Sequence, residues 1–281
     1  MTATLPDLLL EPVIRAALIE DLGPSGDITT RLVIPQNTRY RAKLNAREAG
    51  VVSGLQIAAI AFRLVDPTLA VTLHRPDGSR CVAGDLLLEV EGLASSILSA
   101  ERVALNFAGR LSGIATLTAA FVSETKGTQT RITCTRKTTP GLRLVEKAAV
   151  LHGGGFNHRF GLGDSILIKD NHIAAAGGIR PALTAARAGA SHMMKIEVEV
   201  DTLSQLSELL ELGGADAVLL DNMATATLHQ AVEMVAGRLT TEASGNMALL
   251  RIAEVAETGV NYISAGALTH SARTLDLGLD F

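Results

Sequence analysis

Apolar and polar residues over the first 95 positions follow helical spacing in some stretches and alternate in others. Helical spacing predicts one helix from Pro6 to Asp21 and a second, buried helix at Gly54–Val65. Alternation predicts strands at Tyr40–Ala46, Leu69–His74 and Leu86–Val90. Because these strands and helices do not alternate regularly, they are typical of an α+β layer.

A long helical pattern runs from Ser95 to Lys126, and after Thr128 a strand–helix repeat begins. Its period is about 20 residues, which indicates parallel strands joined by helical crossovers. The predicted strands are Arg131–Thr135, Ser165–Lys169, Met193–Val200, Ala217–Asp221, Leu239–Ala243 and Val260–Ser264. The predicted helices are Ile179–Ala188, Leu203–Leu212, Thr225–Val235 and Ala248–Glu257. Six strands are fewer than the eight of a complete barrel.

Composition narrows the class of protein. Hydrophobic residues make up 47% of the 281 positions but aromatic residues only 3%, which suits aliphatic helices packed on a buried parallel sheet. A net charge of −4 argues against a nucleic-acid or anionic-membrane partner. Cys81 and Cys134 lack metal-site spacing and indicate a reducing compartment. Without a signal-peptide pattern or an apolar run of membrane-spanning length, we expect a cytoplasmic protein.

Each of the six predicted strands after Thr128 ends in polar residues or a glycine turn. The groups are Arg136-Lys137, Lys169-Asp170, Glu197 with Glu199, Asp221-Asn222, Glu242 with Ser244-Gly245-Asn246, and Ala265-Gly266. In barrels and open α/β sheets, ligands bind at the carboxyl ends of the strands. The sequence therefore predicts an active site at this edge.

Five cationic or potentially cationic side chains are interleaved with glycines in this net acidic chain: Arg136, Lys137, His158, Arg159 and Lys169. Taken singly, each is compatible with a surface residue or a hydrogen-bonded core histidine. Together they predict a pocket for a small ligand with several negative charges. Lys169 alone also permits a Schiff base.

Acidic residues and helix entries supply a second set of candidates. Glu199 and Asp221, with Glu197 behind them, can bind Mg²⁺ through hard oxygen ligands, or can pair with the nearby cations. The stretch from Glu242 to Asn246 precedes a predicted helix, where backbone N–H groups suit a phosphate, and Gly266-Ala267 offers a second such place. Neither a Walker nor a dinucleotide glycine pattern is present in the sequence, which disfavours a P-loop or Rossmann cofactor.

Ten motifs follow one another through nearly the whole chain. They are Glu20–Gly23 with Gly26–Thr30, Glu101–Asn106, Leu111–Thr116, Thr135–Gly141, Gly153–Arg159, Lys169–His172, Glu197–Asp201, Leu220–Met223, Glu242–Asn246 and Gly266–Ser271. In this order they closely resemble the quinolinate phosphoribosyltransferases, which are decarboxylating nicotinate-nucleotide pyrophosphorylases. A related molybdenum-transport-associated family diverges around two stretches that this chain keeps, Pro140–Arg143 and Asn157–Arg159.

The resemblance implies an α/β fold of the type II phosphoribosyltransferases. An N-terminal open α/β sandwich would span residues 1–113 and would be joined by a C-terminal segment at 268–281, and an incomplete barrel of six or seven strands would span 114–267. The resemblance also implies a homodimer with shared active sites, and leaves open whether dimers pair further into hexamers.

The resemblance also implies a reaction and its residues. The enzyme would be a pentosyltransferase that uses Mg²⁺, quinolinate and phosphoribosyl pyrophosphate. The quinolinate residues would be Arg102 (of the partner subunit), Thr135, Arg136, Lys137, His158, Arg159 and Lys169. The phosphoribosyl pyrophosphate residues would be Glu199, Asp221, Ser244, Gly245, Asn246, Ala265, Gly266 and Ala267. Lys137, Glu199 and Asp221 are the candidate catalytic residues, the last two also as metal ligands and Lys137 as the proton donor after decarboxylation.

Two alternatives remain open from the residues. One is a Schiff-base aldolase that uses Lys169 and needs no magnesium. The other is a non-catalytic anion-binding or sensor protein on the same scaffold, which would bind quinolinate without turnover.

Overall fold

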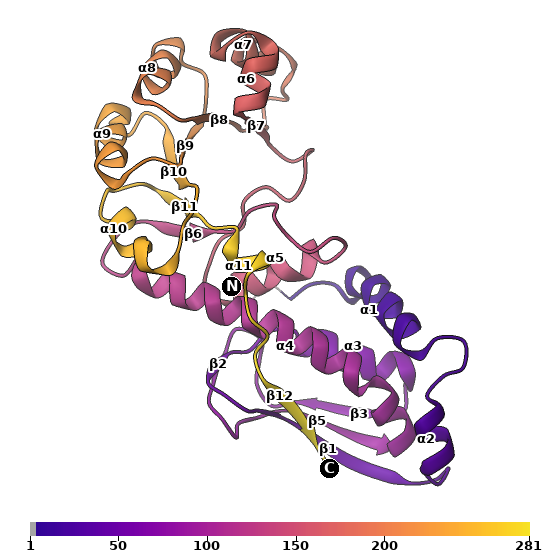
Figure 1. Ribbon diagram of the computed structural model, residues 1–281. Helices are drawn as coiled ribbons and strands as arrows, with labels where there is room; N and C mark the ends of the chain where they lie inside the picture. The colour runs from indigo at the N-terminus through magenta and orange to yellow at the C-terminus, as the bar shows by residue number, and fades with distance from the viewer. Residues whose placement is uncertain (1–3) are drawn as a thin grey trace. The chain divides into compact units, whose positions relative to one another are not determined.

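The computed structural model describes residues 4–281, which form two compact units by their internal contacts (Figure 1). Unit 1 holds residues 4–119, 138–154 and 271–281, and unit 2 holds residues 120–137 and 155–270. Helix α4 (Ala94–Glu124) begins in unit 1, and its last residues belong to unit 2. Each unit has its own sheet and is described separately.

An antiparallel four-stranded sheet forms the centre of unit 1. Its strand order is β12-β1-β5-β3, with β1 at Arg39–Ala46, β3 at Ala70–Leu73, β5 at Leu86–Leu93 and β12 at Leu277–Asp280. Strands β2 (Gly50–Val51) and β4 (Arg80–Cys81) form a separate two-stranded antiparallel sheet in the same unit. The three predicted strands are confirmed, whereas β12, the last strand of the chain, was not predicted.

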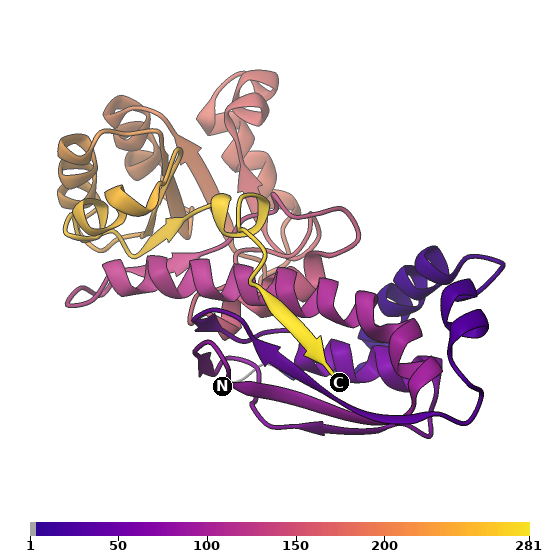
Figure 2. The same ribbon diagram turned by 60° about the horizontal axis from the view of Figure 1, so that its bottom comes forward.

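Unit 1 also contains helices, of which α3 (Leu55–Val65) packs on β3 and β5. The others are α1 (Asp7–Leu22), α2 (Ile28–Val33), the first part of α4, and α5 (Arg143–His152). In both views α3 and this part of α4 lie on the same side of the strands (Figures 1 and 2). The helices predicted before residue 95 are confirmed as α1 and α3. The short helix α2 was missed; its N-cap is Asp27, whose carboxylate accepts a hydrogen bond from the Thr30 N–H.

Helix α4 corrects one expectation from the sequence. By length and composition it is apolar enough to cross a membrane, although the sequence had suggested that no segment was. Of its most apolar 18-residue window, 61% is buried inside the protein. That burial favours a core helix, because a lipid-facing helix would expose its apolar side chains.

A parallel six-stranded sheet forms unit 2, in the order β6-β11-β10-β9-β8-β7. The strands are β6 (Arg131–Thr133), β7 (Ile166–Ile168), β8 (Ile196–Val200), β9 (Ala217–Asp221), β10 (Thr240–Ser244) and β11 (Tyr262–Ser264). All six predicted strands are therefore present, and their parallel pairing fits an incomplete barrel.

Helices follow the strands of this sheet from β7 to β11. They are α6 (Asp170–Ala176), α7 (Ile179–Gly189), α8 (Leu203–Leu212), α9 (Thr225–Val235), α10 (Ile252–Ala256) and α11 (Ala267–His270). Helix α8 begins with a capping box between Thr202 and Gln205 and ends at Gly213. The predicted helix at Ala248–Glu257 is instead a 3₁₀ turn (Leu249–Arg251) followed by α10.

Side-chain alternation along β8, β9 and β10 separates core from site. Val198, Val218 and Ala243 are fully buried on one face of the sheet. Glu199 and Asp221 belong to the opposite face, because successive side chains of a strand point in opposite directions. The sheet thus presents its polar positions together at the carboxyl ends of the strands.

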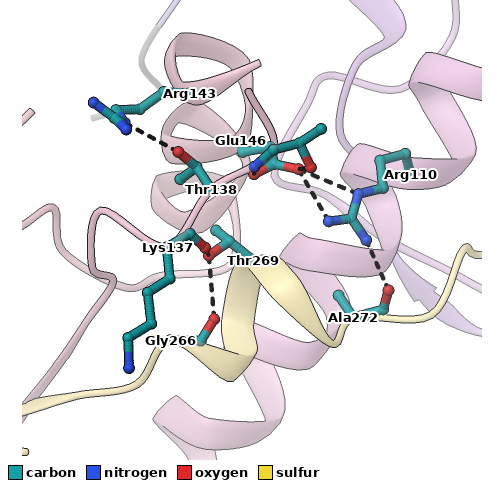
Figure 3. Close-up of polar contacts among 9 residues, drawn as sticks. Arg110, Lys137, Thr138, Arg143, Glu146, Gly266, Thr269 and Ala272 are labelled. Atoms are coloured by element: carbon teal, nitrogen blue, oxygen red, sulfur yellow. Dashed lines mark hydrogen bonds and ion pairs between the residues drawn. The ribbon is translucent and has the colours of Figure 1, made fainter. Parts of the chain in front are cut away.

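Residues 138–154 group with unit 1, whereas the sequence boundaries had placed them inside the barrel. The reason is the fully buried carboxylate of Glu146 on α5, which accepts from Thr139 N (3.0 Å) and from Arg110 Nη2 (3.0 Å). Arg110 also donates to the Ala272 carbonyl at 2.8 Å (Figure 3). These buried polar contacts tie three distant parts of the sequence to unit 1.

The close approach of α4 to the C-terminal segment gives a test of this packing. A Cβ added at Gly113 would lie 1.9 Å from the carbonyl oxygen of Arg273, and backbone cannot yield as a flexible side chain can. We expect Gly113→Ala to lower the free energy of unfolding by roughly 2–4 kcal/mol in urea titrations. Gly189→Ala, with no atom within 4 Å of the added Cβ, is the control and should not destabilise. Equal stability of the two variants would contradict the packing.

Candidate active site

One cavity of about 530 Å³ opens in unit 2 at the carboxyl ends of the parallel strands. Its size is typical of a pocket for small molecules. It is lined by Thr135, Arg136, Lys137, His158, Arg159, Leu167, Lys169, Glu199, Leu219, Asp221, Asn222, Glu242, Ser244, Gly245, Asn246 and Ser264. Residues from separate strand ends therefore share one cavity, as the sequence predicted for that edge.

Most of the predicted site residues line this cavity, and four do not. Arg102 is an exposed residue of α4 in unit 1. Ala265, Gly266 and Ala267 follow β11 and are not among the lining residues. Gly266 nevertheless lies close to the lining, since a Cβ added there would be 2.9 Å from Lys137 Cδ.

Five lining residues had no predicted substrate role, although Asn222 and Glu242 had been named among the strand-end groups: Leu167, Leu219, Asn222, Glu242 and Ser264. Strand alternation was the available signal for most of them. Leu167, Leu219 and Glu242 each stand two positions before a predicted site residue and so share its face of the strand. Leu167 and Leu219 give the cavity an apolar surface among its charges.

Arg136 and Arg159 both line the cavity, and their positive charges repel one another. Burial lowers the pKa of Arg159, and the positive charge of Arg136 lowers this pKa further. One Arg159 N–H is held by the Ser165 carbonyl at 3.1 Å. Two neighbouring, partly desolvated cations destabilise each other, so a ligand with two negative charges would relieve the repulsion.

His158 is oriented by its own chain. Its Nδ1 accepts from the backbone N–H of Arg159 at 2.7 Å, which places the ring proton on Nε2. Nε2 lies 3.2 Å from Glu197 Oε2 and 3.6 Å from Glu242 Oε1. His158 therefore joins two carboxylates from β8 and β10, the strands on either side of β9.

These three side chains also form a group with metal-ligand geometry. Their ligand atoms lie within 4.8 Å of one another, and among residues 4–281 no other group of three or more His, Cys, Asp or Glu does so. The distances from the His158 ring to both carboxylates are those of hydrogen bonds and ion pairs, and ligands of one metal ion would lie about as far from one another. His158, Glu197 and Glu242 form a polar network in the structure.

The pKa of the Glu242 carboxyl group is raised. Burial, followed by the charge of Glu197, raises its pKa to about 7 from an ordinary value of 4.5, although His158 acts in the opposite direction. In the folded protein Glu242 therefore binds a proton at pH values where the unfolded chain has already lost it.

This shift predicts a stability difference that depends on pH. Because the folded-state pKa of Glu242 is raised, its contribution to stability falls as the pH rises from about 4.5 to about 7 and is constant above that window. Relative to Glu242→Gln, we expect the wild type to lose on the order of 3 kcal/mol across the window in denaturation curves. Glu254→Gln, at an exposed position of α10, is the control. A wild-type-to-Glu242→Gln difference that stays constant from pH 5 to pH 8 would refute the shift.

Lys169 and Glu199 form an ion pair among the lining residues of the cavity. Lys169 Nζ donates to Glu199 Oε2 at 2.9 Å, with the lysine side chain 47% exposed and the glutamate 8% exposed. Lys169 also caps α6, where its backbone N–H donates to His172 Nδ1 at 2.9 Å. This ion pair is the pairing of acids with nearby cations that the sequence had allowed.

The chain matches two protein-family models, which together cover most of its length. Residues 27–112 match the profile of the quinolinate phosphoribosyl transferase N-terminal domain, and residues 114–280 match that of the C-terminal domain. Both matches agree with the order of motifs along the sequence.

Individual relatives are similar over nearly their whole length. A probable nicotinate-nucleotide pyrophosphorylase [carboxylating] of Bacillus subtilis is 43% identical over 97% of this chain and 93% of that protein. Quinolinate phosphoribosyltransferase [decarboxylating] 1b of Nicotiana tabacum is 43% identical over 98% of this chain and 83% of that protein. Among solved structures, NadC from Streptococcus pyogenes has a TM-score of 0.95 at 41% identity, covering 99% of this chain and 98% of that one.

Proposed function

Since the chain belongs to the quinolinate phosphoribosyltransferase family, we propose that the cavity of unit 2 is where it carries out the family's reaction. The protein transfers the phosphoribosyl group of phosphoribosyl pyrophosphate to quinolinate with decarboxylation. The products are nicotinate mononucleotide, pyrophosphate and carbon dioxide, in the biosynthesis of NAD. The observation that carries the proposal is the meeting of cations and carboxylates from separate strand ends in one cavity.

The cationic side chains that line the cavity, which we call the cationic wall, are our candidate for the quinolinate site. Arg136, Arg159 and Lys169 would neutralise the two carboxylates of the substrate, helped by Thr135, Lys137 and His158. The side chains of Leu167 and Leu219 would contact the pyridine ring. Arg102 of the partner subunit would complete the site in a homodimer.

Two groups of lining residues are our candidates for the phosphoribosyl pyrophosphate site. They are the carboxylates of Glu199 and Asp221, which we call the acidic wall, and the turn after β10. Glu199 and Asp221 would lie beside the ribose, and Ser244, Gly245 and Asn246 would bind the 5-phosphate through hydroxyl and backbone N–H groups. The turn of Ala265, Gly266 and Ala267, next to Lys137, would extend the phosphate site.

Magnesium fits the acidic wall. Glu199 and Asp221 offer hard carboxylate oxygens to the same cavity, and Mg²⁺ typically binds one or two carboxylates together with substrate phosphates. When bound, the ion would stabilise the negative charge of the departing pyrophosphate.

In the proposed reaction, the cationic residues position the substrate and the carboxylates stabilise developing positive charge. The cationic wall would hold quinolinate so that its ring nitrogen displaces pyrophosphate at the anomeric carbon, and Glu199 and Asp221 would favour the positive charge that develops on the ribose. The ribosylated nitrogen then accepts the electron pair left when the adjacent carboxylate departs as carbon dioxide. Lys137 would donate the proton that replaces this carboxylate on the ring.

Contacts within unit 2 support a fixed position for Lys137. The Thr269 hydroxyl donates to the Lys137 carbonyl at 2.7 Å and also lies 3.2 Å from the Gly266 carbonyl (Figure 3). One buried side chain therefore holds the backbone of the candidate proton donor beside the turn after β11.

A homodimer and a cytoplasmic location complete the proposal. Leu8 and Leu32 of unit 1 are 78% and 77% exposed, which suits helices that a second subunit covers. Cys81 and Cys134 are both buried thiols, which suits a reducing compartment. Light scattering coupled to gel filtration would distinguish a dimer from a hexamer.

The activity is tested by incubating the purified protein with quinolinate, phosphoribosyl pyrophosphate and Mg²⁺. We expect nicotinate mononucleotide and pyrophosphate in equal amounts, with no product when any one component is omitted. Quinolinate binding by calorimetry without turnover would favour an anion sensor. Borohydride trapping of a substrate on Lys169 without magnesium would favour an aldolase.

A further inference from the structure

The loops that follow β9 and β10 contain three residues in the left-handed backbone region. Asn222 has a φ of 53°, Gly245 a φ of 89° and Asn246 a φ of 50°. Among the non-glycine residues that the structure describes, Ala236 is the only other with a positive φ. Strained backbone of this kind is kept where the surrounding structure requires it, often at ligand sites.

The side-chain amide of Asn222 joins the two loops. Its Nδ2 donates to Asp221 Oδ2 at 2.5 Å, and its Oδ1 accepts from Asn246 Nδ2 at 3.2 Å. Its backbone N–H donates to the Ser244 carbonyl at 3.0 Å. Each end of the amide thus has its own partner, and the two partners belong to different loops.

Gly245 makes room for this amide. A Cβ at Gly245 would lie 2.2 Å from Asn222 Oδ1 and 2.8 Å from Asn222 N, closer than any real contact. The second position of the Ser244–Asn246 turn therefore has no side chain, and the side-chain carbonyl group of Asn222 lies against its backbone. The two loops are in direct contact at this point.

We propose that Asn222 is a positioning residue that fixes the Asp221 carboxylate and the Ser244–Asn246 turn in one arrangement, and so sets the geometry in which the phosphoribosyl donor binds. This inference rests on the proposed function, which assigns Asp221 to the ribose and the turn to the 5-phosphate. The donor is a ribose 5-phosphate carrying an activated anomeric carbon, so its two ends must be held at a fixed separation. A single amide that contacts both loops provides that constraint.

The chemistry of the amide explains why neighbouring residue types would fail. Aspartate keeps the size of the side chain but replaces the Nδ2 donor by an oxygen, which would repel Asp221. Glycine accepts the left-handed backbone but contacts neither Asp221 nor Asn246. Both variants should therefore weaken binding of the phosphoribosyl donor, while the residues proposed to bind quinolinate are unchanged.

The test compares donor and acceptor constants in the complete protein. For Asn222→Gly and for Asn222→Asp, we expect the KM for phosphoribosyl pyrophosphate to rise at least ~10-fold, since hydrogen bonds to a charged group are lost. The dissociation constant for quinolinate, measured by calorimetry, should change less than twofold. Calorimetry with phosphoribosyl pyrophosphate alone should show the same weakening as the KM.

Two further variants make the result specific. The double variant Asn222→Gly with Asn246→Ala should weaken donor binding less than the sum of the two single effects. The reason is that each single variant removes the same hydrogen bond, the one between Asn246 and Asn222. Ala236→Gly relieves a left-handed backbone at the end of α9, away from the cavity lining, and should leave both constants unchanged.

The outcomes separate this inference from the proposed function. Wild-type protein without turnover would overturn the proposed function itself. Wild-type turnover with an unchanged donor KM in Asn222→Gly would overturn the role of Asn222. Equal weakening of donor and quinolinate binding would also overturn it, because a general loss of structure affects both substrates.

Discussion

Replacing Arg136 by alanine should lower kcat/KM for quinolinate at least ~100-fold, because a guanidinium that holds a carboxylate contributes roughly 3 kcal/mol. Arg136 lines the cavity beside Arg159, whose lowered pKa reflects burial first and the charge of Arg136 second. The loss should appear in quinolinate binding by calorimetry as well as in steady-state kinetics.

Two controls define that result. Arg136→Lys keeps the charge but lacks the planar donor fork, so it should recover only part of the loss. Arg180→Ala, at an exposed residue of α7, should leave kcat/KM unchanged. A loss of less than threefold in Arg136→Ala would place the quinolinate site elsewhere.

Replacing Asp221 by asparagine should lower kcat/KM for phosphoribosyl pyrophosphate by ~10²–10³-fold. The change keeps the shape of the side chain but removes the negative charge that would face the ribose and the metal ion, and one such electrostatic contact typically has an effect of this size. The Mg²⁺ concentration for half-maximal rate should rise in the same variant. Both quantities come from steady-state assays at varied donor and metal concentrations.

Asp216→Asn is the matched control for this variant. Asp216 immediately precedes β9 and pairs with Lys195 at 2.7 Å, and it is not a lining residue of the cavity. Its replacement should alter stability more than kinetics. An Asp221→Asn enzyme with less than a fivefold loss and an unchanged Mg²⁺ requirement would show that the carboxylate does not serve the donor.

The barrel unit was readable from the sequence because its signals are local. Strands such as β7 and β9 are short apolar runs, β8 alternates apolar and acidic residues, and glycine follows several of the helices, as Gly213 follows α8. The polar residue that ends a strand also identifies the ligand edge. Lys169, Asp221 and Ser244 therefore line the cavity as the pattern predicted.

Contacts between distant positions were not readable. Glu146 lies in the middle of α5, and nothing near it in the sequence indicates that its carboxylate is buried against Arg110. The pairing of β12 with β1 joins residues more than 230 positions apart, including the Asn45 and Asp280 side chains. Local periodicity carries no information about such pairs, so the sequence did not indicate that residues 138–154 group with unit 1 by their contacts.

Details within the site were hidden for similar reasons. The raised pKa of Glu242 depends on burial and on Glu197 of another strand, and neither is visible from residue types. The left-handed backbone of Asn222 is set by its contacts with the turn after β10. The resemblance to a known family supplied the substrates, while the structure supplied these arrangements.

A crystal structure of the protein soaked with quinolinate would test the central claim most directly. The account predicts quinolinate in the cavity of unit 2, with its two carboxylates within hydrogen-bonding distance of Arg136, Arg159 and Lys169 and its ring nitrogen toward Asp221. Ordered quinolinate at another surface, with these three side chains unchanged and solvated, would contradict the account.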